Sequence, residues 1–119
     1  MRDMAYALAD VTKPLRWLSG TQIKTPPVDQ VARRDLGVAL RILHEGGKLS
    51  MPVSRPMPAI GPGCHELRVR DSARQWRLVY RTDADAILIV DVFPKTTQAT
   101  PKRVIDRCQR RLRDYDEQK

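Results

Sequence analysis

The chain has 119 residues, with 22 Lys or Arg against 14 Asp or Glu, so its formal net charge is +8. This length supports one domain with a single core, and a composition of 41% apolar and 30% charged residues excludes a disordered tail. No run approaches the roughly 18 apolar residues of a membrane span, and the positive charge favours an acidic partner, either nucleic acid or protein.

We expect residues 1–12 to form a flexible leader and residues 13–119 to form the single domain. The first residues contain charged side chains and no long apolar stretch, so they do not resemble a secretory signal. The two cysteines, Cys64 and Cys108, have neither metal-site spacing nor a disulfide framework around them. We therefore expect buried thiols, a cytoplasmic protein, and no metal or other cofactor.

The first half of the domain is predicted to contain a short strand over residues 14–18 and a long helix. The helix is expected to begin at Thr25-Pro26-Pro27, because Thr caps free amides and Pro is tolerated in the first turn. It should end at Gly46-Gly47. Close packing against the sheet is one explanation for Gly37 within it. The apolar stripe comprises Val28, Val31, Ala32, Leu36, Ala39, Leu40 and Leu43.

The second half is predicted to contain three strands and a last helix. Residues 48–63 hold four prolines and form neither a helix nor a central strand. Three strands over 65–70, 75–82 and 86–93 follow, with turn residues between them, as in an antiparallel meander. The helix begins at Thr100-Pro101, a cap followed by proline. The fold class is α+β, a small antiparallel or mixed sheet of about four strands with helices packed on it.

Positive charge is concentrated on one face of the predicted meander. Side chains alternate along a strand, so Leu67 and Leu78 share the face that meets the helix layer. The opposite, open face then carries four arginines: Arg68, Arg70, Arg77 and Arg81. Such a face suits phosphate, although a solvated surface without a ligand is the plain alternative. The sequence contains no glycine-rich phosphate loop of the Walker or dinucleotide type.

Four segments in order resemble one family. They are Gly63-Cys64-His65-Glu66-Leu67-Arg68, Trp76-Arg77-Leu78-Val79-Tyr80-Arg81, Val92-Phe93-Pro94-Lys95-Thr96-Thr97-Gln98 with Thr100-Pro101, and Ile105 to Tyr115 with Cys108, Arg111 and Leu112. This series resembles the RelE/ParE superfamily of type II toxins, in its HigB-like, phage-derived branch. The resemblance implies a ribosome-dependent, metal-independent mRNA endoribonuclease that is silenced by a cognate antitoxin, usually a helix-turn-helix protein.

The resemblance also implies roles for individual residues. Arg77 and Arg68 match phosphate-stabilising positions, and a guanidinium grips phosphate oxygens in a fork. Lys95 matches a second cation or proton donor, although family members commonly carry two consecutive lysines where this chain has Lys95-Thr96. Further candidates for nucleic-acid contacts are Arg70, Arg74 and Arg81.

The proton-transfer groups are left open by the sequence. His65 has the suitable chemistry and is either catalytic or a structural histidine on the core side of its strand. Glu66 is either a base or the ion-pair partner of Arg68 or Arg77. Two other functions also remain open: a ParE-type toxin that acts on gyrase, and a catalytically silent binding module.

Overall fold

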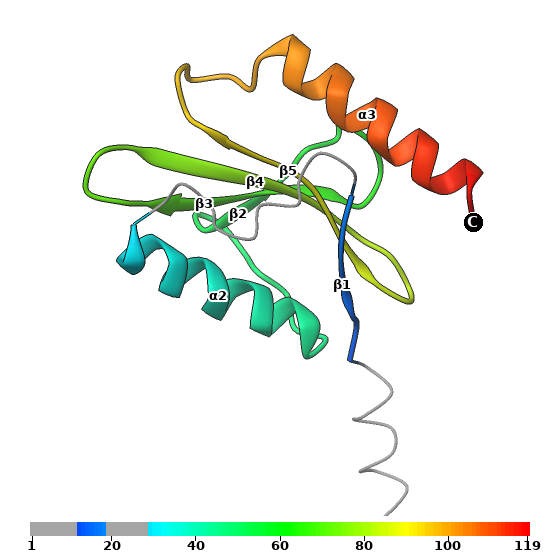
Figure 1. The fold of residues 1–119 in the computed structure, drawn as a ribbon, viewed down its shortest axis with the longest axis horizontal. Coiled ribbons are helices and arrows are strands. Elements are labelled where there is room, and N and C mark those ends of the chain that lie inside the picture. Colours follow the sequence, from blue (N-terminus) through cyan, green and yellow to red (C-terminus); the bar gives the residue numbers. More distant parts are fainter. Residues whose placement is uncertain (1–11, 19–28) are drawn as a thin grey trace, which may run out of the picture.

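The computed structural model describes residues 12–18 and 29–119 of the chain. In this part, a five-stranded mixed sheet lies between two long helices (Figure 1). The strand order is β1-β5-β4-β3-β2. The elements are β1 (Leu15–Trp17), α2 (Gln30–His44), β2 (Ser54–Pro56), β3 (Cys64–Arg70), β4 (Gln75–Thr82), β5 (Ile87–Pro94) and α3 (Lys102–Glu117). The predicted leader, apart from Thr12, and the predicted helix start at Thr25-Pro26-Pro27 lie outside the described residues.

The sheet confirms the α+β fold class and the predicted meander. β3, β4 and β5 pair antiparallel in sequence order, and β1 adds to β5 in parallel. The strand that the sequence did not predict is β2, which pairs with β3 at the sheet edge. Pro56 is tolerated there because an edge strand needs hydrogen bonds on one side only. β5 is the most buried strand, as its apolar sequence predicts.

One face of the sheet packs against α2. Leu36, Leu40 and Leu43 form a core cluster with residues of the three central strands, as predicted. The described helix begins after Asp29, whose carboxylate accepts a hydrogen bond from the Ala32 amide. It ends where Gly46 adopts a φ of 86°, which glycine tolerates best.

One expectation about α2 is wrong, and the explanation offered for Gly37 does not hold. Val31 does not belong to the buried stripe, because 65% of it is exposed. Gly37 is not held by close packing, since a Cβ added there would meet nothing within 4 Å. Both residues lie on the side of the helix that faces away from the sheet, where side chains of any size fit because they do not pack into the core.

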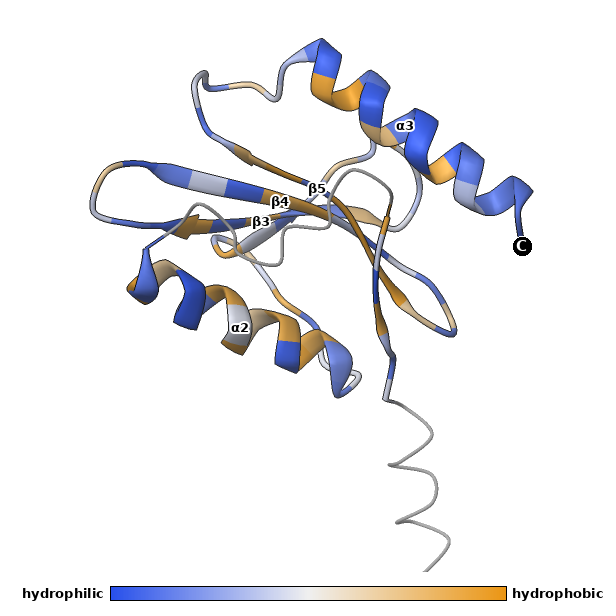
Figure 2. Ribbon diagram, viewed as in Figure 1, coloured by the Kyte–Doolittle hydropathy of each residue, from blue (hydrophilic) through white to orange (hydrophobic). Residues whose placement is uncertain are grey.

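The other face of the sheet packs against α3. Val104, Cys108 and Leu112 contact apolar residues of β3, β4 and β5, and both cysteines are buried as expected. Figure 2 shows the polar outer surface of this helix. The predicted Thr100 cap is wrong: Pro101 occupies the N-cap position, and the Thr100 side chain bonds to the sheet instead. Within the described residues, no helix combines the length and the apolar character that crossing a membrane requires.

Candidate functional site: an arginine cluster around Glu66

Strand register brings three arginines to the α3 side of the sheet. Arg55 pairs with Glu66 across β2 and β3, and Arg68 pairs with Arg77 across β3 and β4. Residues that pair directly across neighbouring strands point to the same face, and so do residues two positions apart on one strand. The four side chains therefore form two adjacent rows on one face.

The three guanidinium groups converge on the carboxylate of Glu66. Its Oε1 lies 3.4 Å from the Nε of Arg77, 3.6 Å from that of Arg68 and 3.7 Å from that of Arg55. Three positive charges against one negative charge leave this group, which we call the arginine cluster, with a net charge of +2. Glu66 thus takes the ion-pair role that was one of its two predicted alternatives, and a single carboxylate cannot neutralise its neighbours.

Burial divides the cluster into an inner and an outer part. The side chains of Glu66 and Arg77 are 0% and 2% exposed, whereas those of Arg55 and Arg68 are 33% and 35% exposed. The three Nε atoms and Glu66 Oε1 are buried without a hydrogen-bond partner in the described part of the chain. Only the outer arginines, Arg55 and Arg68, therefore offer surface to a ligand in this conformation.

The connection from β5 to α3 covers the inner part. Thr100 Oγ1 donates a 2.7 Å hydrogen bond to Glu66 Oε2, and Arg77 donates one of 3.2 Å to the carbonyl of Gln98. The expectation of an open face is therefore wrong for Arg77. Burial lowers the pKa of Arg77, the Glu66 carboxylate opposes that shift, and the charges of Arg68 and Arg55 add to it.

Lys95 and Arg70 continue the positive surface beyond the cluster. Arg70 pairs with Gln75, and the amide of Lys95 donates to the carbonyl of the same glutamine. This third row lies on the face that carries the cluster. Arg70 is exposed and Lys95 is half-buried, so both are open to a ligand at the end of the sheet.

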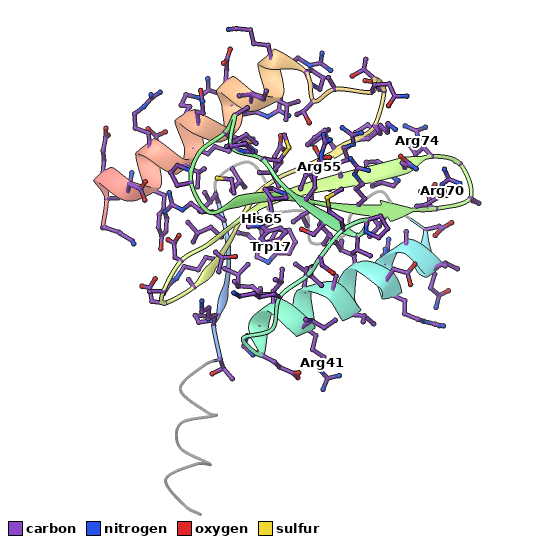
Figure 3. The ribbon with its side chains drawn as sticks, turned by 180° about the vertical axis from the view of Figure 1, so that it is seen from behind. Trp17, Arg41, Arg55, His65, Arg70 and Arg74 are labelled. Atoms are coloured by element: carbon purple, nitrogen blue, oxygen red, sulfur yellow. The ribbon has the colours of Figure 1, made fainter. Side chains whose placement is uncertain are left out.

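Arg74 and Arg81 lie away from the cluster. Arg74 is exposed at the β3–β4 turn, near Arg70 (Figure 3), and stacks over the ring of Trp76 at 5.7 Å. Arg81 is held by two carboxylates, those of Asp83 and Asp116, at 2.7 Å each. These hydrogen bonds raise its pKa and tie β4 to the end of α3. The open-face expectation is wrong for Arg81 too, because its guanidinium is already paired.

His65 lies on the opposite side of the sheet from the cluster. Its ring stacks on Tyr80 with 5.3 Å between the centroids, and it borders a cavity of about 210 Å³ beside the end of α2. Figure 3 shows His65 on the α2 side and Arg55 on the α3 side. The alternation of side chains along β3 predicts that His65 and the arginines lie on opposite faces of the sheet. The imidazole ring is therefore separated from the arginine cluster.

Sequence reasoning missed Arg55 and Thr100 as members of the site. Arg55 lies in the proline-rich segment, where no strand was predicted, so no face could be assigned to it. Thr100 matched a helix cap, and the sequence gave no reason to prefer a contact 34 residues away. In the described ranges, no three His, Cys, Asp or Glu side chains gather in a way that could hold a metal ion.

The sequence of this chain matches one known family model. A model described as phage derived protein Gp49-like (DUF891) matches residues 25–113, which include the whole arginine cluster and the connection above it. The chain belongs to the Gp49-like family. That family is associated with RelE/ParE-like toxins. No curated protein matches this Gp49-like chain.

Proposed function

We propose that this Gp49-like protein is the toxin of a type II toxin-antitoxin pair, in the HigB-like branch, and that it cleaves mRNA on the ribosome. The arginine cluster is the observation that carries the proposal. It has a net charge of +2, two of its arginines are about one third exposed, and Arg70 and Lys95 extend it. Such a toxin acts in the cytoplasm, and a cognate antitoxin, expected to be a helix-turn-helix protein, silences it.

The cleavage reaction requires two contributions from the protein, positive charge at the phosphate and proton transfer. The ribose 2′-oxygen attacks the adjacent phosphorus, the bond to the 5′-oxygen breaks, and a cyclic phosphate and a 5′-hydroxyl result. The extra negative charge on the pentavalent phosphate has to be stabilised, and the arginines supply that charge. A proton leaves the 2′-hydroxyl and another reaches the 5′-oxygen.

The difference in burial assigns different roles to the inner and outer arginines of the cluster. In this proposal Arg68 and Arg55 contact the phosphate, and Lys95 protonates the leaving oxygen. Arg77 lies behind them and holds the Glu66 carboxylate in place. Glu66 is fully buried and orders the three arginines, so in this proposal the 2′-hydroxyl proton passes to water. In this proposal, Arg77 positions the cluster rather than touching the RNA.

The test compares exposed arginines inside and outside the cluster. Arg68→Gln and Arg55→Gln each remove one cluster charge, and Arg110→Gln removes one from the exposed side of α3 as the matched control. After induction, mapping of transcript 5′ ends should show cuts within translated codons for the wild type and the control. Cleavage should fall roughly 10²–10³-fold in the cluster variants, with soluble protein unchanged. Undiminished cleavage by Arg68→Gln and Arg55→Gln would overturn the proposal.

One observation favours a second function, a toxin that binds a target such as gyrase without RNA chemistry. His65 lies across the sheet from the cluster, so no histidine of the described chain accompanies the arginines. DNA damage on induction without transcript cuts would support the gyrase-type toxin. Neither DNA damage nor cuts would support a silent binding module.

A further inference from the structure

The large apolar side chains that the described chain exposes lie together on one side of the molecule. They belong to α2 and to the connection that follows it: Val31, Val38, Ile42, Met51 and Val53, with exposed fractions from 38% to 68%. Single apolar residues on a surface are ordinary, but a group on one side indicates an interaction site. Figure 2 shows apolar positions on the outer side of α2 as well as on its sheet side, whereas the outer side of α3 is polar.

The outer apolar residues of α2 follow the spacing of a helix-pairing seam. Val31, Asp35, Val38 and Ile42 succeed one another at steps of four, three and four residues. This is the spacing of alternating core positions in a coiled coil. The core of this protein does not explain the pattern, because other residues of α2, such as Leu36 and Leu40, contact the sheet.

A groove lies beside this seam. It has a volume of about 520 Å³ and runs between α2, the 48–53 connection and the edge of β3. Val38 and Ile42 form its helical wall, and Met51 and Val53 form the opposite wall. Several side chains of a second helix lying along the seam could enter this groove.

Positive charge borders the apolar surface on both sides. Lys48, Arg68 and Arg70 line the groove. Arg34 and Arg41 flank the seam along α2, with Arg41 in an exposed ion pair with Glu45. In a paired helix, such flanking positions choose partners of opposite charge. Asp35 stands within the seam itself and would face a basic residue of the partner.

We propose that the outer side of α2 and the adjoining groove bind an amphipathic helix of another protein. The seam requires an apolar stripe on that helix, the arginines and Lys48 require Asp or Glu on both sides of the stripe, and Asp35 requires one Lys or Arg within it. The proposal concerns binding alone and does not depend on RNA cleavage.

A designed peptide tests the charge requirement directly. The probe is a labelled four-heptad peptide with Leu at positions a and d, one Lys at a central a position and Glu at e and g. Its glutamates repel one another, which disfavours self-association. Fluorescence anisotropy should show saturable binding to the full chain below about 100 µM. A matched peptide with Lys at e and g should bind at least about tenfold more weakly.

Variants of the exposed seam locate the binding surface. Val38→Glu and Ile42→Glu should weaken binding of the acidic peptide at least about tenfold, because each places a charge in an apolar contact. Val38→Leu should bind the acidic peptide as the wild type does. Gln118→Glu is the matched control, because it makes the same change of charge at an exposed position beyond α3, and it too should bind normally. Circular dichroism checks that each variant stays folded.

Three results would overturn the inference. They are the absence of saturable binding by the acidic peptide, equal binding of the two peptides, and equal binding to wild type and Val38→Glu. A fourth concerns the occupant. If sedimentation shows a dimer of the wild type that Val38→Glu converts to monomer, a second copy of this chain covers the surface instead. Because the peptide assay measures no cleavage, an inactive enzyme leaves its outcome unchanged.

Discussion

The Nε of Arg77 lies 3.4 Å from Oε1 of Glu66, and neither side chain has appreciable contact with solvent. An arginine on a sheet face is usually a surface residue, and its removal is then nearly neutral. Here the arginine is part of the interior, between β4 and the connection to α3. Its contribution to stability is therefore inseparable from its role in the arginine cluster.

Arg77→Ala should destabilise the protein by about 3–5 kcal/mol, the usual cost of breaking a buried ion pair from one side. Of its three arginines, the Glu66 carboxylate would keep only the two that are partly exposed, and the bond from Arg77 to the Gln98 carbonyl would be lost. Urea unfolding followed by circular dichroism measures the change. Arg68→Gln, in which a side chain that is 35% exposed is altered, should cost much less. Equal losses for the two variants would contradict the inner and outer division.

Thr100→Val isolates the contact between the helix connection and the cluster. Valine keeps the shape but cannot donate to Glu66 Oε2, so a buried carboxylate oxygen loses its hydrogen bond. We expect a loss of about 1–3 kcal/mol in the free energy of unfolding. Thr96→Val, at an exposed position of the same connection, is the matched control. The Thr100 side chain makes no capping hydrogen bond to the helix, so the loss should trace to Glu66. It should therefore vanish when Thr100→Val is introduced into Glu66→Leu, which has no acceptor for the hydroxyl.

Hydrophobic periodicity predicted most of the fold. The stripe through Leu36, Leu40 and Leu43 and the alternation around Leu67 and Leu78 each require one buried face, and local spacing alone reveals them. The same alternation correctly put Arg68 and Arg77 on one face and His65 on the other.

What the sequence could not reveal was the environment of that face. Whether α3 and the connection before it cover this face depends on the path of the chain after β5. The alternation of side chains along the strands gives no information about that path. A second feature hidden from the sequence is a register irregularity between Val79 and Tyr80, which leaves Val90 without a partner on β4. Beyond this irregularity, the residues of β5 that point to a given face are shifted by one position. A strict alternation of faces counted from Leu88 would therefore assign Lys95 to the wrong face of the sheet. Arg55 was missed because β2 is three residues long and contains a proline.

Gly37→Ala should stabilise the protein by roughly 1 kcal/mol, because glycine in a helix interior costs about that much relative to alanine. Apart from its own stretch of helix, the added methyl group would meet nothing within 4 Å. Thermal or urea unfolding measures the gain. Leu40→Ala, on the sheet side of the same helix and 7% exposed, should instead lose about 2–5 kcal/mol. A destabilising Gly37→Ala would mean that this side of α2 is covered in solution.

Both thiols should resist modification in the folded protein. Burial raises the pKa of Cys64 to about 11 and that of Cys108 to about 12. At pH 8 the reactive thiolate would then be a small fraction of each, roughly one in a thousand or less. Ellman's reagent should label neither cysteine until denaturant unfolds the chain, after which two thiols should react. Rapid labelling of native protein would contradict the burial of these residues.

Acid should weaken the junction between α2 and the β3–β4 turn. Asp29 accepts hydrogen bonds from the amides of Ala32 and Ser72, and Asp71 accepts from the amides of Arg74 and Ala73 and from the Trp76 indole. Backbone hydrogen bonds to Ala32 and Arg74 are the largest causes that lower the pKa of Asp29 and Asp71, respectively.

A lowered pKa in the folded state means that the unfolded chain binds more protons in acid, so protonation favours unfolding. The contribution of both carboxylates should be fully present above the unfolded pKa of about 4 and should be lost as pH falls through the lower, folded values. Urea midpoints measured between pH 7 and pH 2 should show this loss. Asp29→Asn and Asp71→Asn should each lower the midpoint at pH 7 and flatten its fall in acid, and the double variant should flatten it further. Variants that keep the wild-type slope would show that these carboxylates do not govern acid unfolding.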